Sequence, residues 1–164
     1  MNLFFLYIFL LAGLDQAIKF WVRANLKSHV YTEVIPNFIH LTYQENKGVS
    51  FSFLADMPDS VRAPLLAGIS LVVIVGMGIY FVRDFSKLTR LEHWGFTLIL
   101  AGAIGNLIDR AFRHSVTDYM YFHFYTKGFF VNNLADDFIS IGFVLLVVQG
   151  FLIGNKENGK DETP

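Results

Sequence analysis

Three carboxylates stand at the two ends of one short stretch of this chain, VTDYMYFHFYTKGFFVNNLADDF, residues 116–138. Asp118 lies near its start, and Asp136 and Asp137 lie near its end. Two carboxylates that meet in a partly desolvated site share a proton, because two adjacent like charges cannot both ionise cheaply. Such a dyad can activate water against a peptide carbonyl, with one acid as the base and the other as the proton donor.

The composition places these acids in or beside a membrane. The chain has 164 residues, of which 54% are hydrophobic and 16% charged, whereas a soluble domain carries about 25% charged residues. Thirteen basic and fourteen acidic residues nearly cancel, so the charge predicts no nucleic-acid partner. The chain contains no cysteine, which excludes disulfides, thiolate nucleophiles and cysteine metal ligands.

Four apolar segments are long enough to cross a bilayer, which needs about 20 residues and at least about 17. They are residues 3–22, 65–82, 95–112 and 138–154. We therefore predict an all-α integral membrane protein with one domain over residues 1–154 and a polar tail over residues 155–164. The first segment lacks the basic start and the cleavage site of a signal peptide, so we expect it to be retained as a helix.

Four crossings place both termini on one side of the membrane, together with the loop 83–94. That loop contains Arg83, Lys87 and Arg90, and this density of basic residues predicts that the termini are cytoplasmic. On the other side, NFIHLTYQENKGVSFSFL alternates apolar and polar residues around Glu45–Gly48. We predict two short strands joined by a tight turn there, and hence a small extracytoplasmic β-sheet beside the four helices.

Charged residues also occur inside the first predicted span. Asp15 and Lys19 are four positions apart, so they share one helix face with the acid N-terminal, the better order for a pair. They either form an internal ion pair that lowers the cost of burying two charges or line a functional site. The sequence leaves both alternatives open.

A polar stripe follows one face of the third span. Its members are Gly102, Asn106, Asp109 and Arg113. Hydrogen bonds to neighbouring helices could account for single polar residues, but two of them one turn apart favour a site-lining role. Ala101 and Gly105 form a small-xxx-small pair that allows another helix to approach closely.

The fourth span begins with a second polar stripe formed by Asn133, Asp136 and Ser140. Asp137 points about 100° away from Asp136 on a helix, so the two adjacent acids cannot share a direction. The third span runs outward and the fourth runs inward. Asp118 and Asp136 therefore lie at the same leaflet, and a connection that folds back would bring them together.

Other chemistries fit the sequence less well. It contains no G-x-S-x-G or H-E-x-x-H motif. His114 and His123 flank Asp118, but they lack helical metal-ligand spacing, and we expect no metal or organic cofactor. A small transporter subunit that relays protons through buried acids and lysines is the alternative function, and a purely structural membrane subunit is a third.

In five blocks the chain resembles the bacterial lipoprotein signal peptidase (signal peptidase II) family. The blocks are DQAIK (15–19), NKGVSFS (46–52), GAIGNLIDR (102–110), VTDY (116–119) and NNLAD (132–136). Each block alone is weak, but their order and spacing among four spans are specific. The resemblance covers nearly the whole chain and implies the family's fold, four membrane helices with a small extracytoplasmic sheet.

The resemblance implies an intramembrane aspartic endopeptidase of the bacterial inner membrane. Such enzymes remove the signal peptide from diacylglyceryl-modified prolipoproteins and cut on the N-terminal side of the lipidated cysteine. The expected partners are these substrates and membrane lipid, the expected state is a monomer, and no cofactor is implied. The absence of cysteine is consistent with this function, because the lipidated cysteine belongs to the substrate.

The resemblance also assigns residues. It places the catalytic dyad on Asp118 and Asp136. The positions that match residues shaping or lining the family's site are Asn46, Gly102, Asn106, Asp109, Arg110 and Asn133, together with the first-helix pair of Asp15 and Lys19.

The chain departs from the family pattern at four positions. Ala103 stands where a second glycine is frequent, Ser50 where alanine is common, and Asn132 where phenylalanine is usual. Asp137 occupies a position often held by a small hydroxyl residue. It adds a third acid near the predicted dyad, so a pH optimum cannot be carried over from the family.

Overall fold

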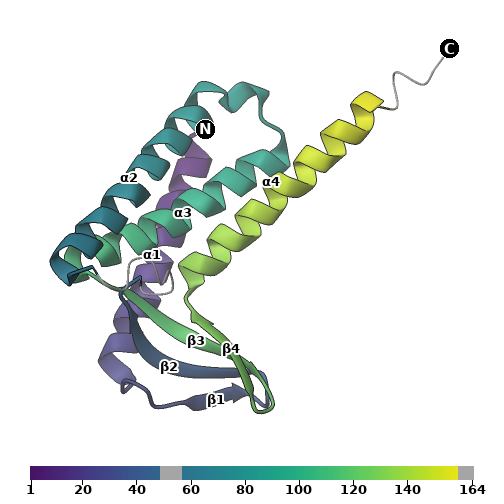
Figure 1. The fold of residues 1–164 in the computed structure, drawn as a ribbon. Helices are drawn as coiled ribbons and strands as arrows, with labels where there is room; N and C mark the ends of the chain where they lie inside the picture. Colours follow the sequence, from purple (N-terminus) through teal and green to yellow (C-terminus); the bar gives the residue numbers. More distant parts are fainter. Residues whose placement is uncertain (49–56, 159–164) are drawn as a thin grey trace.

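A computed structural model describes residues 1–48 and 57–158. Four long helices dominate the described part of the chain (Figure 1): α1 (Asn2–Asn25), α2 (Asp59–Arg83), α3 (Arg90–Arg113) and α4 (Leu134–Asn158). Each helix contains one of the predicted spans and is long and apolar enough to cross a membrane. The predicted four-helix membrane architecture is therefore confirmed.

The helix ends follow local signals. The 3₁₀ turn η2 (Phe85–Lys87) connects α2 to α3, and α3 begins with a capping box between Thr89 and Glu92. α3 ends at His114, whose φ of 61° turns the chain out of the helix and into the sheet. The predicted start of the fourth span near residue 138 was late, because α4 already begins at Leu134.

α3 is the central helix of the bundle. It contacts α1, α2 and α4, and it lies between α2 and α4 in Figure 1. Ile8, Phe81, Leu100 and Ala101 form a buried cluster within the bundle. The outward faces are apolar as well, and Phe9, Val72 and Phe143 are all mostly exposed. A helix that is apolar on its exposed face as well as its buried face is suited to lipid.

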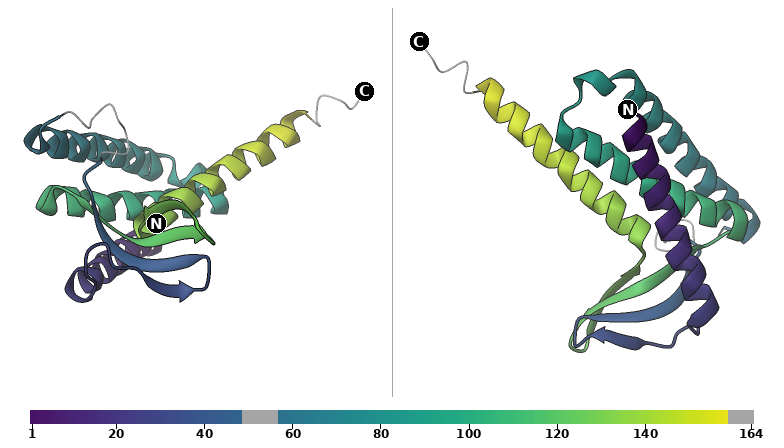
Figure 2. Two further views of the ribbon diagram at one scale, coloured as in Figure 1. Left: turned by 60° about the horizontal axis from the view of Figure 1, so that its bottom comes forward. Right: turned by 180° about the vertical axis from the view of Figure 1, so that it is seen from behind.

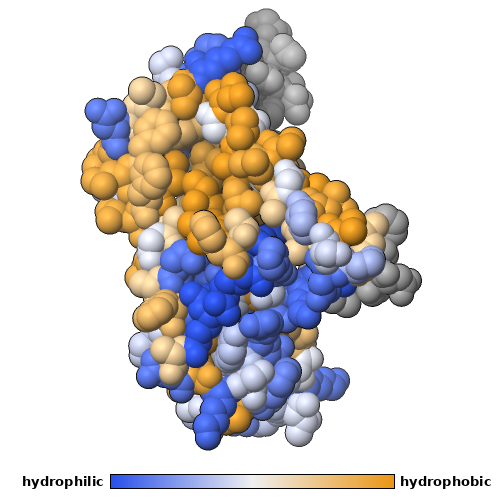
Figure 3. Space-filling model, turned by 90° about the vertical axis from the view of Figure 1, so that its left-hand side faces the viewer, coloured by the Kyte–Doolittle hydropathy of each residue, from blue (hydrophilic) through white to orange (hydrophobic). Residues whose placement is uncertain are grey.

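A four-stranded antiparallel sheet packs at one end of the bundle (Figures 1 and 2). Its strands lie in the order β1 (Thr32–Ile35), β2 (Ile39–Asn46), β3 (Val116–Phe124) and β4 (Lys127–Asn132). α1 ends beside this sheet and contacts β2 and β3. Figure 3 shows apolar side chains over the helical part and hydrophilic ones over the end that carries the sheet.

The sheet differs in detail from the one predicted. Residues before Glu45 do form a strand, β2, but its hairpin partner is β1, reached through a turn at residues 36–38. The second predicted strand, beyond Gly48, falls on residues 49–56 and lies outside the described residues. On its other side β2 pairs with β3, which places Gln44 opposite Asp118.

The aromatic connection between the third and fourth spans is itself a hairpin. Residues 116–124 form β3, and residues 127–132 form β4, antiparallel to it. The sequence predicts a fold-back connection here, but neither strand was predicted. The signal was available, because VTDYMYFHF is rich in β-branched and aromatic residues, which favour strands.

Candidate active site

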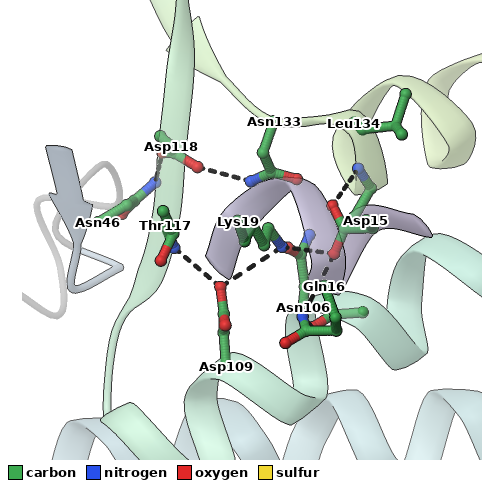
Figure 4. Close-up of polar contacts among 12 residues, drawn as sticks. Asp15, Gln16, Lys19, Asn46, Asn106, Asp109, Thr117, Asp118, Asn133 and Leu134 are labelled. Carbon is green, nitrogen blue, oxygen red and sulfur yellow. Dashed lines mark hydrogen bonds and ion pairs between the residues drawn. The ribbon is translucent and has the colours of Figure 1, made fainter. Parts of the chain in front are cut away.

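Asp118 lies on β3 and is held from two sides (Figure 4). Asn46, the last residue of β2, donates a hydrogen bond of 2.9 Å from Nδ2 to Asp118 Oδ2. Asn133, just before α4, donates one of 2.6 Å from Nδ2 to Asp118 Oδ1. Because both donors are neutral amides, they orient the carboxyl group without forming an ion pair with it.

Asn133 also positions the second acid. Its Oδ1 atom accepts a hydrogen bond of 3.1 Å from the backbone nitrogen of Asp136, and it therefore caps the first turn of α4. The Asp136 side chain accepts a hydrogen bond of 2.7 Å from Asn106 Nδ2. One asparagine thus contacts the carboxyl group of Asp118 and the backbone of Asp136, which brings the two acids to one site.

Lys19 of α1 supports this arrangement from inside the bundle. Its fully buried Nζ atom lies 2.8 Å from Asn106 Oδ1, 2.9 Å from Asp15 Oδ2 and 3.4 Å from Asp109 Oδ2. Since Lys19 donates to the oxygen of the Asn106 amide, the nitrogen of that amide points to Asp136. The predicted ion pair of Asp15 and Lys19 is present, and it reaches the second acid through Asn106.

Asp109 connects the end of α3 to the strand that carries Asp118. Its Oδ2 atom accepts a hydrogen bond of 2.9 Å from the backbone nitrogen of Thr117. Arg23 of α1 lies 3.4 Å from Asp109 Oδ1 and donates a hydrogen bond of 2.9 Å to Thr117 Oγ1. Since Thr117 directly precedes Asp118, these contacts set the position of the first acid.

The start of α4 is packed closely against α1 and α3. Ala135 donates a backbone hydrogen bond of 3.1 Å to Asp15 Oδ1, which places a carboxylate at a helix N-terminus. Gly102 makes this approach possible, because a Cβ atom there would lie 2.2 Å from Ala135 O. A Cβ atom on Gly105 would lie 2.5 Å from Asp15 Oδ2. Both glycines therefore act through close packing beside the acids.

Burial decides the proton affinity of Asp118, which is 3% exposed. Loss of water around the charged form raises the pKa of Asp118 to about 6. The hydrogen bonds from Asn133 and Asn46 favour the carboxylate and oppose this shift, whereas the negative charge of Asp136 adds to it. Asp118 is thus poised to hold a proton in mildly acidic conditions.

A cavity of about 480 Å³ opens onto Asp118 from the side of the sheet. Its lining combines polar residues of β2 with apolar residues of β4. The lining residues are Gln44, Glu45, Asn46, Lys47, Asp118, Phe129, Phe130 and Val131. This mixture suits an extended peptide, whose backbone needs hydrogen-bond partners and whose side chains can be apolar.

Comparison with known proteins identifies the family. The profile of the family described as Signal peptidase (SPase) II matches residues 7–152, which is most of the chain. The chain belongs to the signal peptidase II family. This is a family of peptidases, which favours a peptidase over a proton-relaying transporter subunit or a purely structural subunit.

Curated relatives and solved structures agree with membership of the signal peptidase II family. A lipoprotein signal peptidase of Fusobacterium nucleatum is 37% identical over 95% of this chain and 90% of that protein. One of Yersinia pseudotuberculosis is 39% identical over 88% of this chain and 84% of that protein. Two solved bacterial membrane enzymes, each 23% identical, share the fold. One has a TM-score of 0.78 over 91% of this chain and 92% of its own chain. The other has a TM-score of 0.81 over 100% of this chain and 95% of its own chain.

The structure gathers most of the residues that the signal peptidase II resemblance assigned. Asp118, Asp136, Asn46, Asn106 and Asn133 form one hydrogen-bonded group. Asp15, Lys19 and Asp109 lie directly behind it. Arg110 is half-buried, and its charge acts on both Asp118 and Asp136. It forms no direct ion pair with any residue that the structure describes.

Three predicted placements differ in the structure. Asn133 is the N-cap of α4 and not a member of a helical stripe, and Ser140 is exposed, so that stripe does not continue inward. Arg113 leaves the stripe of the third span as well, because it is exposed and lies 3.6 Å from Glu45.

Asp137 accepts a hydrogen bond of 2.7 Å from Asn132 at the end of β4 and contacts neither acid of the pair directly.

Sequence reasoning missed Gln16, Arg23 and Thr117. Gln16 donates a hydrogen bond of 2.9 Å to Gly105 O and so joins α1 to α3. Arg23 could have been found, because it continues the spacing of Asp15 and Lys19 by four further positions. Thr117 had no signal, since its backbone nitrogen bonds to Asp109 and its hydroxyl bonds to Arg23 only through the tertiary structure.

The histidines considered as metal ligands lie apart. His114 is exposed at the end of α3, whereas His123 is buried in the sheet. Within residues 1–48 and 57–158, no group of three or more His, Cys, Asp or Glu side chains could hold a metal ion.

Proposed function

We propose that this protein is an aspartic endopeptidase that removes the signal peptide from diacylglyceryl-modified prolipoproteins, cutting N-terminal to the lipidated cysteine. The observation that carries the proposal is the convergence of Asp118 and Asp136 on Asn133 from different elements. Membership of the signal peptidase II family and the names of the relatives support the substrate class.

The two acids take different roles in the proposed reaction. Asp118 holds the shared proton, because burial raises its pKa to about 6. Asp136 serves as the base, with its carboxyl group oriented by the N–H donor of Asn106. Asp136 accepts a proton from a water molecule as the water oxygen attacks the scissile carbonyl carbon, and Asp118 hydrogen-bonds the carbonyl oxygen as negative charge develops there.

The tetrahedral intermediate then collapses. The bond between the carbonyl carbon and the amide nitrogen breaks, and the proton taken up by Asp136 passes to the departing amine of the lipidated cysteine. The signal peptide leaves as a carboxylic acid, so water is divided between the two products. No step requires a group outside the two acids and water. Asn46 and Asn133 hold Asp118 throughout, and Arg110 adds a positive charge near both acids.

The membrane arrangement suits such a substrate. We infer that the sheet is extracytoplasmic and that both termini are cytoplasmic, because the loop between α2 and α3 holds Arg83, Lys87 and Arg90. The acids then lie where the bundle meets the sheet, at the outer edge of the membrane. A lipid-anchored peptide reaches this level without leaving the bilayer, and we propose that the protein acts as a monomer.

The test is cleavage of a diacylated prolipoprotein in liposomes by the wild type and three variants. We expect Asp118→Asn and Asp136→Asn each to lower the cleavage rate by about 10²–10⁴-fold, because each removes an acid–base group. Asp137→Asn is the matched control. It removes the adjacent acid, whose carboxyl group accepts a hydrogen bond from Asn132 at the end of β4, and we expect it to keep most of the activity.

Thermal unfolding of each variant in detergent shows whether it is folded. Full activity of a folded Asp118→Asn or Asp136→Asn variant would contradict the dyad. An inactive Asp137→Asn beside an active Asp136→Asn would move the second acid to the neighbouring position.

A further inference from the structure

A second cavity, of about 400 Å³, lies on the face of the sheet opposite Asp118. Five ring side chains line it: Tyr31, His40, Tyr121, His123 and Tyr125. Asp118 and Tyr121 are three positions apart on β3, and side chains on a strand alternate between faces, so the two residues point away from each other. The proposed peptidase reaction uses none of these five rings.

The rings are held in place by the register of the sheet. Glu33, His40 and Tyr121 lie directly opposite one another across β1, β2 and β3, so they share one face. The rings of Tyr31 and Tyr121 are 5.1 Å apart at 60°, and those of Tyr121 and His123 are stacked at 5.4 Å. This arrangement forms an open cage with aromatic walls.

The cage presents electron-rich groups to a ligand. His123 Nδ1 lies 2.9 Å from the carbonyl oxygen of Tyr125, which can only accept, so Nδ1 donates this hydrogen bond and fixes the ring as a wall of the cage. His123 is 5% exposed, and its Nε2 has no hydrogen-bond partner within the described part of the chain. Glu33 adds a carboxylate, 3.7 Å from His40 Nε2.

These features favour a cation as the ligand. Aromatic faces attract cations, and Glu33, on the same face of the sheet as His40, supplies a negative charge. No lysine or arginine is among the residues that line the cavity in the described structure. A primary ammonium group fits better than a quaternary one, because it has N–H donors for the carboxylate of Glu33.

We propose that this cage binds the ammonium group of an ethanolamine phospholipid headgroup. The bilayer is the source that the position of the cage favours, because the sheet adjoins the outer end of four membrane helices. Phe38, Phe124 and Tyr125 are exposed nearby, and aromatic side chains settle at headgroup depth. Lys127, at the start of β4 in the same hairpin, is exposed and adds a positive charge to this end of the sheet.

The experiment measures lipid retention by native mass spectrometry of the detergent-solubilised protein. Equal amounts of phosphatidylethanolamine and phosphatidylglycerol are offered, so that the lipids differ in the ammonium group. We expect the wild type to retain the ethanolamine lipid about threefold over the glycerol lipid, in line with a partly exposed cation–π site. Tyr31→Leu and Glu33→Gln should each bring this ratio close to one.

Two further variants separate the cage from its surroundings. Tyr31→Phe keeps the aromatic ring and should keep the preference. Phe124→Leu removes an exposed ring of the same hairpin that does not line the cavity, and it should also keep the preference. Prolipoprotein cleavage by each variant serves as the measure of folding, because none of these residues belongs to the candidate active site.

The proposal is overturned if the wild type retains both lipids equally, or if Tyr31→Leu and Glu33→Gln leave its preference unchanged. A loss of preference in Phe124→Leu equal to that in Tyr31→Leu would also overturn it, because the effect would then come from the apolar rim. Soluble phosphoethanolamine that displaces the lipid at equal concentration would rule out the membrane as the source of the ligand.

Discussion

Asn133 is the residue on which the candidate site depends most directly. Its amide nitrogen bonds to Asp118 and its amide oxygen bonds to the backbone of Asp136. It is fully buried, so water does not compete for either bond. Asparagine is among the best N-cap residues, and here the group that starts a helix also sets the distance between two acids. The carboxyl group of Asp137 instead accepts a hydrogen bond from Asn132.

Asn46 permits a test of how the proton is held. Its N–H group stabilises the carboxylate of Asp118 and therefore opposes the burial that raises the pKa of Asp118 to about 6. In Asn46→Ala we expect a still higher pKa, so Asp118 keeps its proton to a higher pH. The alkaline limb of the kcat/KM profile, which reports the free enzyme, should then move upward from about pH 6.

Gln44→Ala is the matched control for this profile. Gln44 lies opposite Asp118 in the sheet but bonds to Tyr31, so its loss should leave the limb in place. A downward shift in Asn46→Ala, or an equal shift in both variants, would contradict the role given to Asn46.

At the scale of the elements, the site is a junction of α1, α3, α4 and β3. α1 contributes Asp15 and Lys19, whose ion pair is fully buried. A buried pair is costly unless further hydrogen bonds satisfy it. Here the bonds of Lys19 to Asn106 and of Asp15 to Ala135 provide them. The pair therefore joins α1 to α3 and α4, and through Asn106 it also helps to position Asp136.

The contact between α3 and α4 offers a prediction at the same scale. In Gly102→Ala the added methyl group would lie 2.2 Å from Ala135 O, so the start of α4 must shift and take Asp136 with it. A displacement of about 1 Å at an active site can lower the rate about 10²-fold, and we expect a loss of kcat/KM of that order. Cleavage of a diacylated prolipoprotein in detergent measures it.

Gly76→Ala is the control for this substitution. Gly76 lies in α2, and a Cβ atom there would meet nothing within 4 Å. We expect normal cleavage and unchanged or slightly higher thermal stability, since alanine favours helix more than glycine does. If Gly102→Ala cleaved the substrate as fast as Gly76→Ala, the close packing of α3 against the start of α4 would not be needed to position Asp136.

At the scale of the whole molecule, two surfaces divide the protein. Apolar side chains cover the helices, and hydrophilic side chains gather over the end with the sheet (Figure 3). The candidate site lies where these surfaces meet, because Asp118 is on β3 and Asp136 is in the first turn of α4. A membrane-anchored substrate would meet the acids at this boundary.

The orientation can be tested because the chain has no cysteine of its own. Thr126 lies in the exposed turn between β3 and β4, and Ser86 is exposed between α2 and α3. We expect a membrane-impermeant maleimide to label Thr126→Cys in intact spheroplasts and to label Ser86→Cys only after permeabilisation. The reverse pattern would place the sheet in the cytoplasm and exclude the proposed orientation.

Much of this protein could be derived from local sequence. An apolar stretch of sufficient length predicts a membrane helix wherever it occurs, since in lipid the backbone must satisfy its own hydrogen bonds. The four helices were therefore predictable, and so was the shared face of Asp15 and Lys19, because helical spacing is local. The acids at residues 118 and 136 were also singled out, as polar residues at the edge of a membrane.

The tertiary structure decided what these residues contact. β2 and β3 are far apart in the sequence, and no local pattern states that they pair, so the neighbour of the strand that carries Asp118 could not be derived. Likewise, the sequence favoured Asp136 over Asp137 through its helical stripe and the family resemblance, but it did not predict that Asn106 of α3 bonds to Asp136 and Asn132 of β4 bonds to Asp137. The sequence by itself determined the helices and the candidate acids, because those signals are local. Only packing between distant segments decided which side chains hold each acid, because those partners come from distant parts of the sequence.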